Sequence, residues 1–311
     1  MYNQKISSSA IIGKNVALGE NVEVGERVVI KDGCIIGNNV VLCNDVYIDY
    51  NVIIRDNVTI KECGTIGARC VLGEHLADFY EDRNNKCHPL VIGENTLIRS
   101  ESIIYGSNTI GDNLQTGHRV TIRENSKIGK HVRIGTLSDI QGDCEIQDYV
   151  NMHSNVHVGQ KSIIKKYVWL FPYVILTNDP NPPSTTLIGV TIEEFAVVST
   201  GSIILPGVTI KSGSLVGAGA IVTKDIEAGM VAVGNPAKMR CPVEKIVDNI
   251  SGENIYPWRY TFDRGMPWQG IGYDKWKQGK NDLGGVSKIH VFKPANMPHL
   301  LDNSTSGKEV A

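Results

Sequence analysis

The sequence carries an apolar residue at every sixth position. This repeat occupies residues 12–72, 92–176 and 192–222, and 31 of its 32 positions are apolar, the exception being Thr116. A period of six matches neither the period of an α-helix nor the two-residue alternation of a long strand. It fits very short strands joined by tight corners. Such corners require backbone dihedral angles that Gly, Asn and Asp tolerate better than other residues. Inward-facing residues then fill a narrow core, and successive coils hydrogen-bond at a spacing of about 4.8 Å.

The repeat resembles a known family. Segments such as Ile12-Gly-Lys-Asn-Val16 follow the pattern Ile-Gly-x-x-Val and are similar to those of the hexapeptide-repeat acyltransferases. The resemblance implies an all-β fold, a left-handed parallel β-helix with three repeats per coil, over residues 1–238. Residues 239–311 are expected to form a short helical and irregular tail. Seven aromatic residues gather between Tyr256 and Trp276, so this tail should pack on the rod or on a neighbouring subunit.

Two insertions interrupt the repeat. Residues 74–90 are charged and without pattern, and residues 178–189 are rich in Asn, Asp and Pro. Loops set into a regular scaffold often carry function. We therefore expect the functional site beside these insertions.

Composition limits the partners and the compartment. A formal net charge of -2 gives no electrostatic case for nucleic acid or for an anionic membrane surface. No apolar run approaches the roughly 18 residues of a membrane span, and the first residues lack the core of a signal peptide. The seven cysteines have no paired spacing, and Cys34, Cys70 and Cys144 fall at inward positions. We expect free thiols and a reducing compartment, the cytoplasm.

The end of the repeat resembles the acyl-donor site of the family. The resemblance implies a homotrimer that holds acetyl-CoA, as a co-substrate, between adjacent rods. Residues 198–208 and 215–220 carry small side chains that would admit the pantetheine arm, and residues 233–238 resemble the segment near the adenine. The alternative is that this last segment only caps the final coil. The expected donor-binding residues are Thr200, Gly201, Ala218, Gly219, Lys224, Asn235, Pro236, Ala237 and Lys238.

The second insertion resembles a more specific group. Residues 176–184, with residues 115–122 and 135–142, are similar to the N-acetyltransferases of nucleotide-linked 3-amino-3,6-dideoxyhexoses. The resemblance implies a dTDP-linked sugar substrate and a role in lipopolysaccharide or S-layer glycan assembly. It places Asn178 and Asp179 at the reacting amine, with no histidine base, because the sulfur of the coenzyme takes the proton. The alternative role for the pair is ordinary turn formation.

The repeat itself predicts neighbours, because three repeats make a coil of eighteen residues. Eighteen-residue steps back from Asn178 lead to Gln160, Gly142 and Glu124. Gln160 should therefore lie one strand spacing from Asn178, and we include it among the catalytic residues. Glu124 is assigned to the substrate site on the same column. A Gln cannot anchor a cationic amine as a carboxylate would.

Other polar residues are weaker candidates for substrate binding. Arg119 and Arg123 face outward and could hold a diphosphate. Tyr80 and Arg83, in the first insertion, could close over a nucleotide. A solvated surface is the alternative for all four residues.

Two other reactions compete with N-acetylation. An O-acetyltransferase would use His153 or His157 as a general base, and His157 stands one coil after Asp139. If neither histidine is a base, both remain candidates for substrate binding. A metal-dependent enzyme like the carbonic anhydrases of this fold needs three converging histidines. Because His118, His153 and His157 are not separated by multiples of eighteen residues, we predict no metal site.

Overall fold

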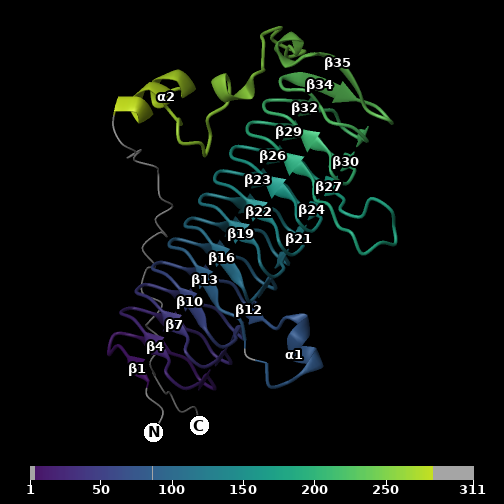
Figure 1. Cartoon of the computed structure of the whole chain (residues 1–311). Coiled ribbons are helices and arrows are strands. Elements are labelled where there is room, and N and C mark those ends of the chain that lie inside the picture. Colours follow the sequence, from purple (N-terminus) through teal and green to yellow (C-terminus); the bar gives the residue numbers. More distant parts are fainter. Residues whose placement is uncertain (1–3, 86, 283–311) are drawn as a thin grey trace, which may run out of the picture.

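The chain winds into a left-handed parallel β-helix, as the six-residue repeat predicts. The computed structural model describes residues 4–85 and 87–282. Three parallel sheets run along the rod (Figure 1), with 11, 13 and 11 strands. The eighteen-residue step is confirmed: Lys5 pairs with Glu23, for example, and His157 with Ile175.

The first sheet faces outward with mostly polar residues. Its strands are β1 (Lys5–Ile6), β4 (Glu23–Val24), β7 (Val41–Leu42), β10 (Val58–Ile60), β13 (Leu90–Ile92), β16 (Asn108–Ile110), β19 (Lys127–Ile128), β22 (Glu145–Ile146), β25 (Ile163–Ile164), β28 (Thr191–Ile192) and β31 (Thr209–Ile210).

The second sheet ends in a hairpin, where β34 and β35 pair antiparallel. Its strands are β2 (Ile11–Ile12), β5 (Val29–Ile30), β8 (Tyr47–Ile48), β11 (Thr65–Ile66), β14 (Leu97–Ile98), β17 (Gln115–Thr116), β20 (Arg133–Ile134), β23 (Asn151–Met152), β26 (Trp169–Leu170), β29 (Val197–Val198), β32 (Leu215–Val216), β34 (Met230–Val233) and β35 (Lys238–Pro242).

The third sheet faces outward with mostly branched apolar residues. Its strands are β3 (Ala17–Leu18), β6 (Ile35–Ile36), β9 (Ile53–Ile54), β12 (Val71–Glu74), β15 (Ile103–Tyr105), β18 (Thr121–Ile122), β21 (Asp139–Ile140), β24 (His157–Val158), β27 (Ile175–Leu176), β30 (Ile203–Ile204) and β33 (Ile221–Val222).

Three corners join the sheets. We call them the first corner (first to second sheet), the second corner (second to third) and the third corner (third back to first). Each corner holds a residue in the left-handed region, such as Asn15 (φ 55°) or Gly33 (φ 74°). The sequence predicted Gly, Asn and Asp at these places, but Arg119, Leu137 and Tyr167 adopt the same conformation.

Hydrogen bonds between coils explain this difference. The amide of Arg119 donates to Ser100 O (3.1 Å), and that of Tyr167 donates to Asp148 O (3.2 Å). A left-handed corner costs a side-chain-bearing residue energy, but it persists where the surrounding structure fixes the backbone. The side chains at these corners also stack in columns, one coil on the next.

Both insertions leave the rod at the third corner, and Figure 1 shows them projecting from the same side. The first contains α1 (Ala77–Glu81) and lengthens the step, so that Thr59 pairs with Val91. Across the second, Ile163 pairs with Thr191. The coils resume in register after each, so the insertions change the surface and not the core.

The tail covers a column of aromatic rings at the first corner. His131, Tyr149, Tyr167 and Phe195 stack at centroid distances of 4.6, 5.5 and 4.9 Å. Tail residues bury the end of this column, and Trp258 donates from Nε1 to Phe195 O (2.9 Å). The buried tail side chains are Trp258, Met266, Trp268 and Trp276.

The apolar residues Val243, Ile246, Val247 and Ile250 have helical spacing and predict a short helix over residues 242–250, which does not form. Only a 3₁₀ turn, Val243–Lys245, forms after β35, because Pro242 is still part of that strand. The Asp248 carboxylate then accepts the amides of Ile250 and Ser251 and turns the chain. A second 3₁₀ turn, Trp258–Tyr260, and α2 (Tyr273–Asp282) follow. The rest of the tail, residues 283–311, lies outside the described residues.

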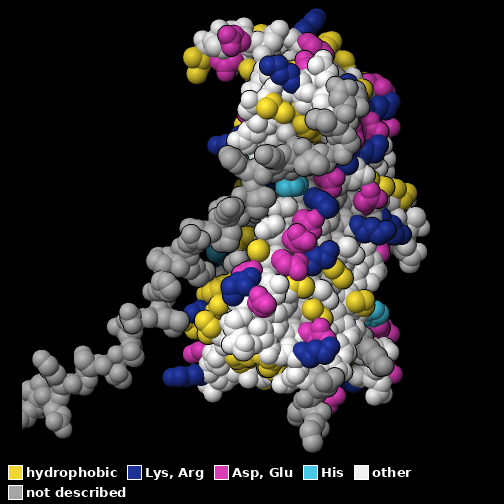
Figure 2. Space-filling view, turned by 90° about the vertical axis from the view of Figure 1, so that its left-hand side faces the viewer, with side chains coloured by type: hydrophobic (Ala, Val, Ile, Leu, Met, Phe, Trp, Pro, Cys, Tyr) yellow, Lys and Arg dark blue, Asp and Glu magenta, His cyan; other side chains and the backbone are white. Residues whose placement is uncertain are grey.

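The surface and the thiols are ordinary for such a rod. Acidic and basic side chains alternate over the flank that Figure 2 shows, so no large area of one sign appears there. In residues 4–85 and 87–282, no helix has the length and apolar character to cross a membrane.

The seven cysteines are free thiols, and Cys34, Cys70 and Cys144 are buried. Burial raises the pKa of the Cys144 thiol to about 11.

The inward residues should carry most of the stability. Ile122, on β18, is fully buried, whereas its neighbour Thr121 faces outward. We expect Ile122→Ala to lower the free energy of unfolding by about 2–5 kcal/mol, because it removes packed atoms and leaves a cavity. Thr121→Ala, the control, should cost less than about 1 kcal/mol. Urea unfolding measures both, and equal losses would contradict the assigned register.

Candidate functional site

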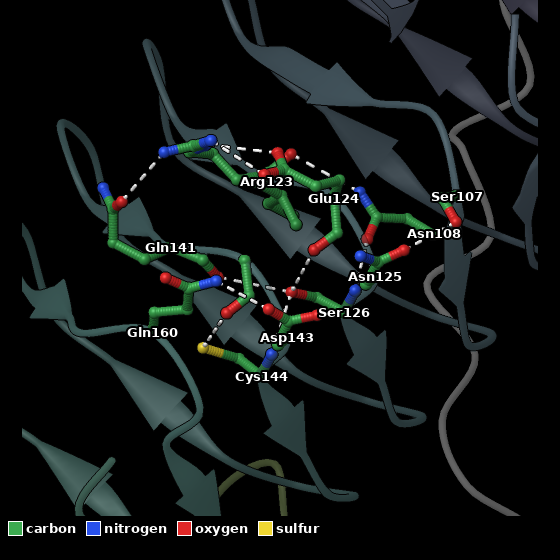
Figure 3. Close-up of polar contacts among 12 residues, drawn as sticks. Ser107, Asn108, Arg123, Glu124, Asn125, Ser126, Gln141, Asp143, Cys144 and Gln160 are labelled. Carbon is green, nitrogen blue, oxygen red and sulfur yellow. Dashed lines mark hydrogen bonds and ion pairs between the residues drawn. The ribbon is translucent and has the colours of Figure 1, made fainter. Parts of the chain in front are cut away.

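A row of hydrogen-bonded polar side chains runs along the third corner and onto the third sheet. Arg123 donates from Nη2 to Glu124 Oε1 (2.7 Å) and from Nη1 to Gln141 Oε1 (3.3 Å). Gln141 donates from Nε2 to Asp139 Oδ2 (2.6 Å), and the same oxygen lies 3.1 Å from His157 Nδ1. Figure 3 shows the corner half of this polar row, where Arg123 lies between Glu124 and Gln141.

The coil register brings the row together. Asp139 on β21 and His157 on β24 are directly paired, and Arg123 and Gln141 stand at the same place of successive coils. Burial would raise the pKa of the Asp139 carboxyl, but hydrogen bonds from His157 and Gln141 and the charge of Arg123 hold it below its usual range. The carboxylate therefore stays ionised and orients the imidazole. Nε2 of His157 makes no hydrogen bond within the described residues.

Gln160 and Asn178 lie further along the same corner, as the eighteen-residue step predicted. Gln160 donates from Nε2 to Asp143 Oδ2 (2.6 Å), which Figure 3 also shows. Gly159 lies against Asn178 in the next coil, since a Cβ at Gly159 would come within 3.2 Å of the Asn178 Cβ. The side-chain amide of Gln160 is thus bonded to an acid of the same corner.

The second insertion separates the roles of Asn178 and Asp179. The Asp179 carboxylate accepts hydrogen bonds from the Ser184 hydroxyl (2.7 Å), the Ser184 amide (2.9 Å) and the Asn181 amide (3.0 Å). These hydrogen bonds lower the pKa of the Asp179 carboxyl, and the bond from the Ser184 hydroxyl has the largest effect. Asp179 therefore holds the loop together. The side-chain amide of Asn178 makes no hydrogen bond in the described part of the chain and is free to meet a ligand.

The first insertion flanks the polar row. Arg83 lies over the rings of Phe79 (5.1 Å) and Tyr80 (5.8 Å). At the base of the insertion, Glu74 pairs with Tyr105, and Arg123 lies 5.8 Å from the Tyr105 ring centroid. The third corner therefore gathers most of the residues predicted for the acceptor site: Tyr80, Arg83, Arg123, Glu124, Gln160, Asn178 and Asp179.

Arg119 and His153 lie elsewhere, on the second corner. Arg119 donates from Nε to Glu101 Oε2 (2.6 Å), so its charge is already matched. His153 stacks on Phe171 at 4.8 Å, and burial lowers its pKa. Within one chain the whole third sheet separates Arg119 and His153 from Asn178, so their predicted role in substrate binding stays a prediction.

The residues predicted for the donor also gather on the second corner, in the last coils. The Gly219 amide donates to Thr200 O (2.9 Å), and the Ala237 amide donates to Ile221 O (2.8 Å). A Cβ at Gly201 or Gly219 would meet nothing within 4 Å, so this edge is open. The residues brought together are Thr200, Gly201, Ala218, Gly219, Asn235, Pro236, Ala237 and, at the start of β35, Lys238. Lys224 is not among them, because it follows β33 on the third corner.

Sequence reasoning passed over Gln141, which links Arg123 to Asp139. The eighteen-residue step from Arg123 leads to it and could have found it. For metals, residues 4–85 and 87–282 contain no group of three or more His, Cys, Asp and Glu side chains that could hold an ion.

Comparison with known proteins identifies the family to which the six-residue repeat belongs. Residues 9–44 match the family model described as "Bacterial transferase hexapeptide (six repeats)". The protein named dTDP-4-amino-4,6-dideoxy-D-glucose acyltransferase, from Escherichia coli, is 30% identical over 158 residues, which are 47% of this chain and 79% of that protein. The chain belongs to the hexapeptide-repeat acyltransferases. It is therefore an acyltransferase by family.

Other relatives of this acyltransferase are more distant. The bifunctional protein GlmU of Alkaliphilus metalliredigens is 26% identical over 186 residues, 54% of this chain but only 34% of GlmU. A UDP-N-acetylglucosamine acyltransferase structure from Arabidopsis aligns with a TM-score of 0.33 and 17% identity, over 76% of this chain and 74% of that one. The acetyltransferase domain of PglB from Neisseria gonorrhoeae, in complex with acetyl coenzyme A, aligns with a TM-score of 0.26 and 16% identity. The alignment covers 45% of this chain and 58% of that one. The family assignment rests on the sequence match.

The Arg119 contact predicts an acid-dependent effect on stability. Glu101 accepts hydrogen bonds from Arg69 and Arg119, which lower its pKa to about 2. An unfolded Glu titrates near about 4.3, so the stabilisation is complete above that pH and is lost as the pH falls through about 2. Arg119→Gln should raise the Glu101 pKa and move acid unfolding to higher pH, measurable by NMR titration and circular dichroism. Arg123→Gln, the control, should leave the Glu101 pKa unchanged, and an unchanged value in Arg119→Gln would refute the pairing.

Proposed function

We propose that this acyltransferase moves an acetyl group from acetyl-CoA to the amine of a nucleotide-linked amino-deoxy sugar. The observation that carries the proposal is the free amide of Asn178 on the third corner, against Gly159 of the preceding coil, on a chain whose curated relative is named as an acyltransferase of a dTDP-linked amino sugar. That relative takes a 4-amino sugar, whereas the second insertion resembles enzymes for 3-amino sugars. The assay therefore tests both 3-amino and 4-amino sugars, each linked to dTDP, UDP or GDP.

A homotrimer would complete the site. The predicted donor residues other than Lys224 lie across the third sheet from Asn178, so one chain alone holds them apart. The outward surface of that sheet is largely apolar: Ile35 is 51% exposed and Ile175 is 36% exposed. An exposed apolar strip of this kind marks a surface for association. Adjacent rods could then bring the second corner of one copy to the third corner of another.

The chemistry follows from this arrangement. The neutral amine attacks the thioester carbonyl carbon, a C–N bond forms, and the C–S bond breaks. The sulfur of coenzyme A leaves as a thiolate and takes the proton that the amine loses. Asn178 would hold the amine by a hydrogen bond with its lone pair toward the carbonyl carbon, without competing for its proton. Asp179 keeps Asn178 in place through the loop.

A second candidate is O-acetylation with His157 as the general base. The observation that favours it is the contact between His157 Nδ1 and Asp139, which leaves Nε2 to take a proton from a hydroxyl. A hydroxyl needs such a base, whereas an unprotonated amine does not. The two reactions are therefore separated by mutating the two residues.

We expect Asn178→Ala to lower kcat/KM for the amino sugar by about 10²-fold, the range for losing one positioned transition-state contact. His157→Ala should cost less than about 10-fold, mostly in KM. Turnover with acetyl-CoA is measured by release of free thiol. An inactive His157→Ala beside a nearly normal Asn178→Ala would replace this mechanism with the histidine-base reaction on a hydroxyl.

The donor edge has a matched control within the chain. Ala218-Gly219 stands on the second corner, and Ala228-Gly229 forms the same exposed turn on the first. A Tyr at 218 should obstruct the pantetheine arm and abolish the thermal stabilisation that coenzyme A gives the wild type. Ala228→Tyr should keep it. Stabilisation by coenzyme A that persists in Ala218→Tyr would move the donor to another edge.

A further inference from the structure

Between the tail and the second sheet lies a pocket, open to solvent, that the catalytic scheme does not use. Its volume is about 240 Å³. One aromatic ring of the rod faces two of the tail: the ring of Trp169 lies 6.0 Å from that of Trp258 and 5.5 Å from that of Phe262, both nearly perpendicular. The lining residues are Trp169, Phe171, Val197, Ile255, Tyr256, Trp258, Thr261 and Phe262.

One buried polar atom of this pocket lacks a partner among the described residues. The indole N–H of Trp169 is buried and makes no hydrogen bond within the described residues. The corresponding groups of Trp258 and Trp268 are satisfied, by Phe195 O (2.9 Å) and Phe262 O (3.2 Å). Buried donors are nearly always paired, so an unpaired one in a pocket wall points to an acceptor on a ligand. An aromatic-walled slot with an unpaired indole N–H suits a flat heterocycle that carries a carbonyl or a ring nitrogen.

Two arginines lie beside the slot without a counter-charge. The Arg133 guanidinium meets the tail at Gly265, where an added Cβ would lie 2.9 Å from Nη2, and Gly265 follows Arg264 in the chain. Arg264 lies 5.9 Å from the centroid of Phe262, a wall of the pocket. Neither arginine forms an ion pair or a side-chain hydrogen bond with the described residues. Burial lowers the pKa of Arg133, and the charge of Arg264 lowers it further, so the pair would gain from an anion.

The second sheet sets the spacing between the two features. Arg133, Asn151 and Trp169 face outward from the successive strands β20, β23 and β26. Arg133 and Trp169 are thus roughly 10 Å apart, or two strand spacings. The slot and the arginine pair together match a molecule with an aromatic base at one end and phosphate at the other. The slot also borders the predicted donor edge, because the Gly201 amide donates to Pro172 O (2.9 Å) next to Phe171.

We infer that this tail pocket binds a nucleotide, with the base against Trp169 and Phe262 and the phosphates on Arg133 and Arg264. The inference rests on the proposed function in one respect, since both proposed substrates carry a nucleotide. The base belongs either to the sugar nucleotide or to the 3′-phosphoadenosine end of coenzyme A. Both are aromatic bases linked to phosphate, and the experiment separates them.

The test is a titration of the full chain with dTDP, UDP, 3′,5′-ADP and pyrophosphate, followed by calorimetry and by tryptophan fluorescence. Arg264→Gln should weaken binding of the recognised nucleotide by 10-fold or more, and Trp169→Phe, which keeps a ring and removes the N–H, by several-fold. Arg240→Gln removes an exposed arginine of β35 and is the matched control. Tight dTDP or UDP binding assigns the pocket to the sugar nucleotide, and tight 3′,5′-ADP binding assigns it to the coenzyme.

Two results would overturn the inference: pyrophosphate binding as tightly as every nucleotide, or Arg264→Gln and Trp169→Phe binding nucleotides like Arg240→Gln. The proposed function fails separately. If no acetyl transfer occurs but Arg264-dependent nucleotide binding remains, the pocket stands and the reaction does not. If transfer proceeds in Arg264→Gln and Trp169→Phe with unchanged KM for both substrates, the reaction stands and the pocket does not.

Discussion

Parallel hydrogen bonding from coil to coil is the constraint on which the rest of this molecule depends. It places each residue above the one eighteen positions earlier, and it holds residues as different as Arg119 and Tyr167 in left-handed corners. Side chains then form columns, and a column can be structural or chemical. The same rule stacks His131, Tyr149 and Tyr167 into a ladder of rings and pairs Asp139 with His157. Position on the rod, more than local sequence, decides what each side chain meets.

Much of the fold could be predicted because the repeat is local and nearly unbroken. The eighteen-residue step also predicted the pairing of Asp139 with His157 and placed Gln160 one coil from Asn178. The eighteen-residue step does not hold across an insertion. Arg69 donates to Glu101 across the first insertion, where the step is longer, and Glu101 is also the partner of Arg119. It also says nothing of how a loop folds, so the role of Asp179 needed the Ser184 contacts.

The tail was beyond pattern-based prediction for a different reason. Its seven aromatic residues keep no single period, since four alternate over residues 256–262 and three follow at irregular spacing. Their positions follow from the aromatic column that they cover. That column ends at Phe195, whose carbonyl receives the Trp258 indole, and the tail must then cross the second sheet. In crossing it, the tail brings Phe262 to Trp169 and Gly265 to Arg133. The apolar covering of one corner thus creates an aromatic slot and a charged edge on the neighbouring sheet.

The corners also explain how such a rod acquires specificity without disturbing its core. The second insertion adds ten residues between Ile163 and Thr191, yet these residues pair as any coil does, and Asn178 O accepts the Ile188 amide (2.8 Å) to close the loop. The entropic cost of closing a loop grows only slowly with the length of the loop, so the fold tolerates an insertion at a corner. The loop leaves the side-chain amide of Asn178 without a hydrogen bond in the described residues, on the same corner as the row that Arg123 and Asp139 join. Under the proposed function, the choice between an amine and a hydroxyl acceptor depends on two side chains, the amide of Asn178 and the imidazole of His157, and the coil of the rod is the same for both.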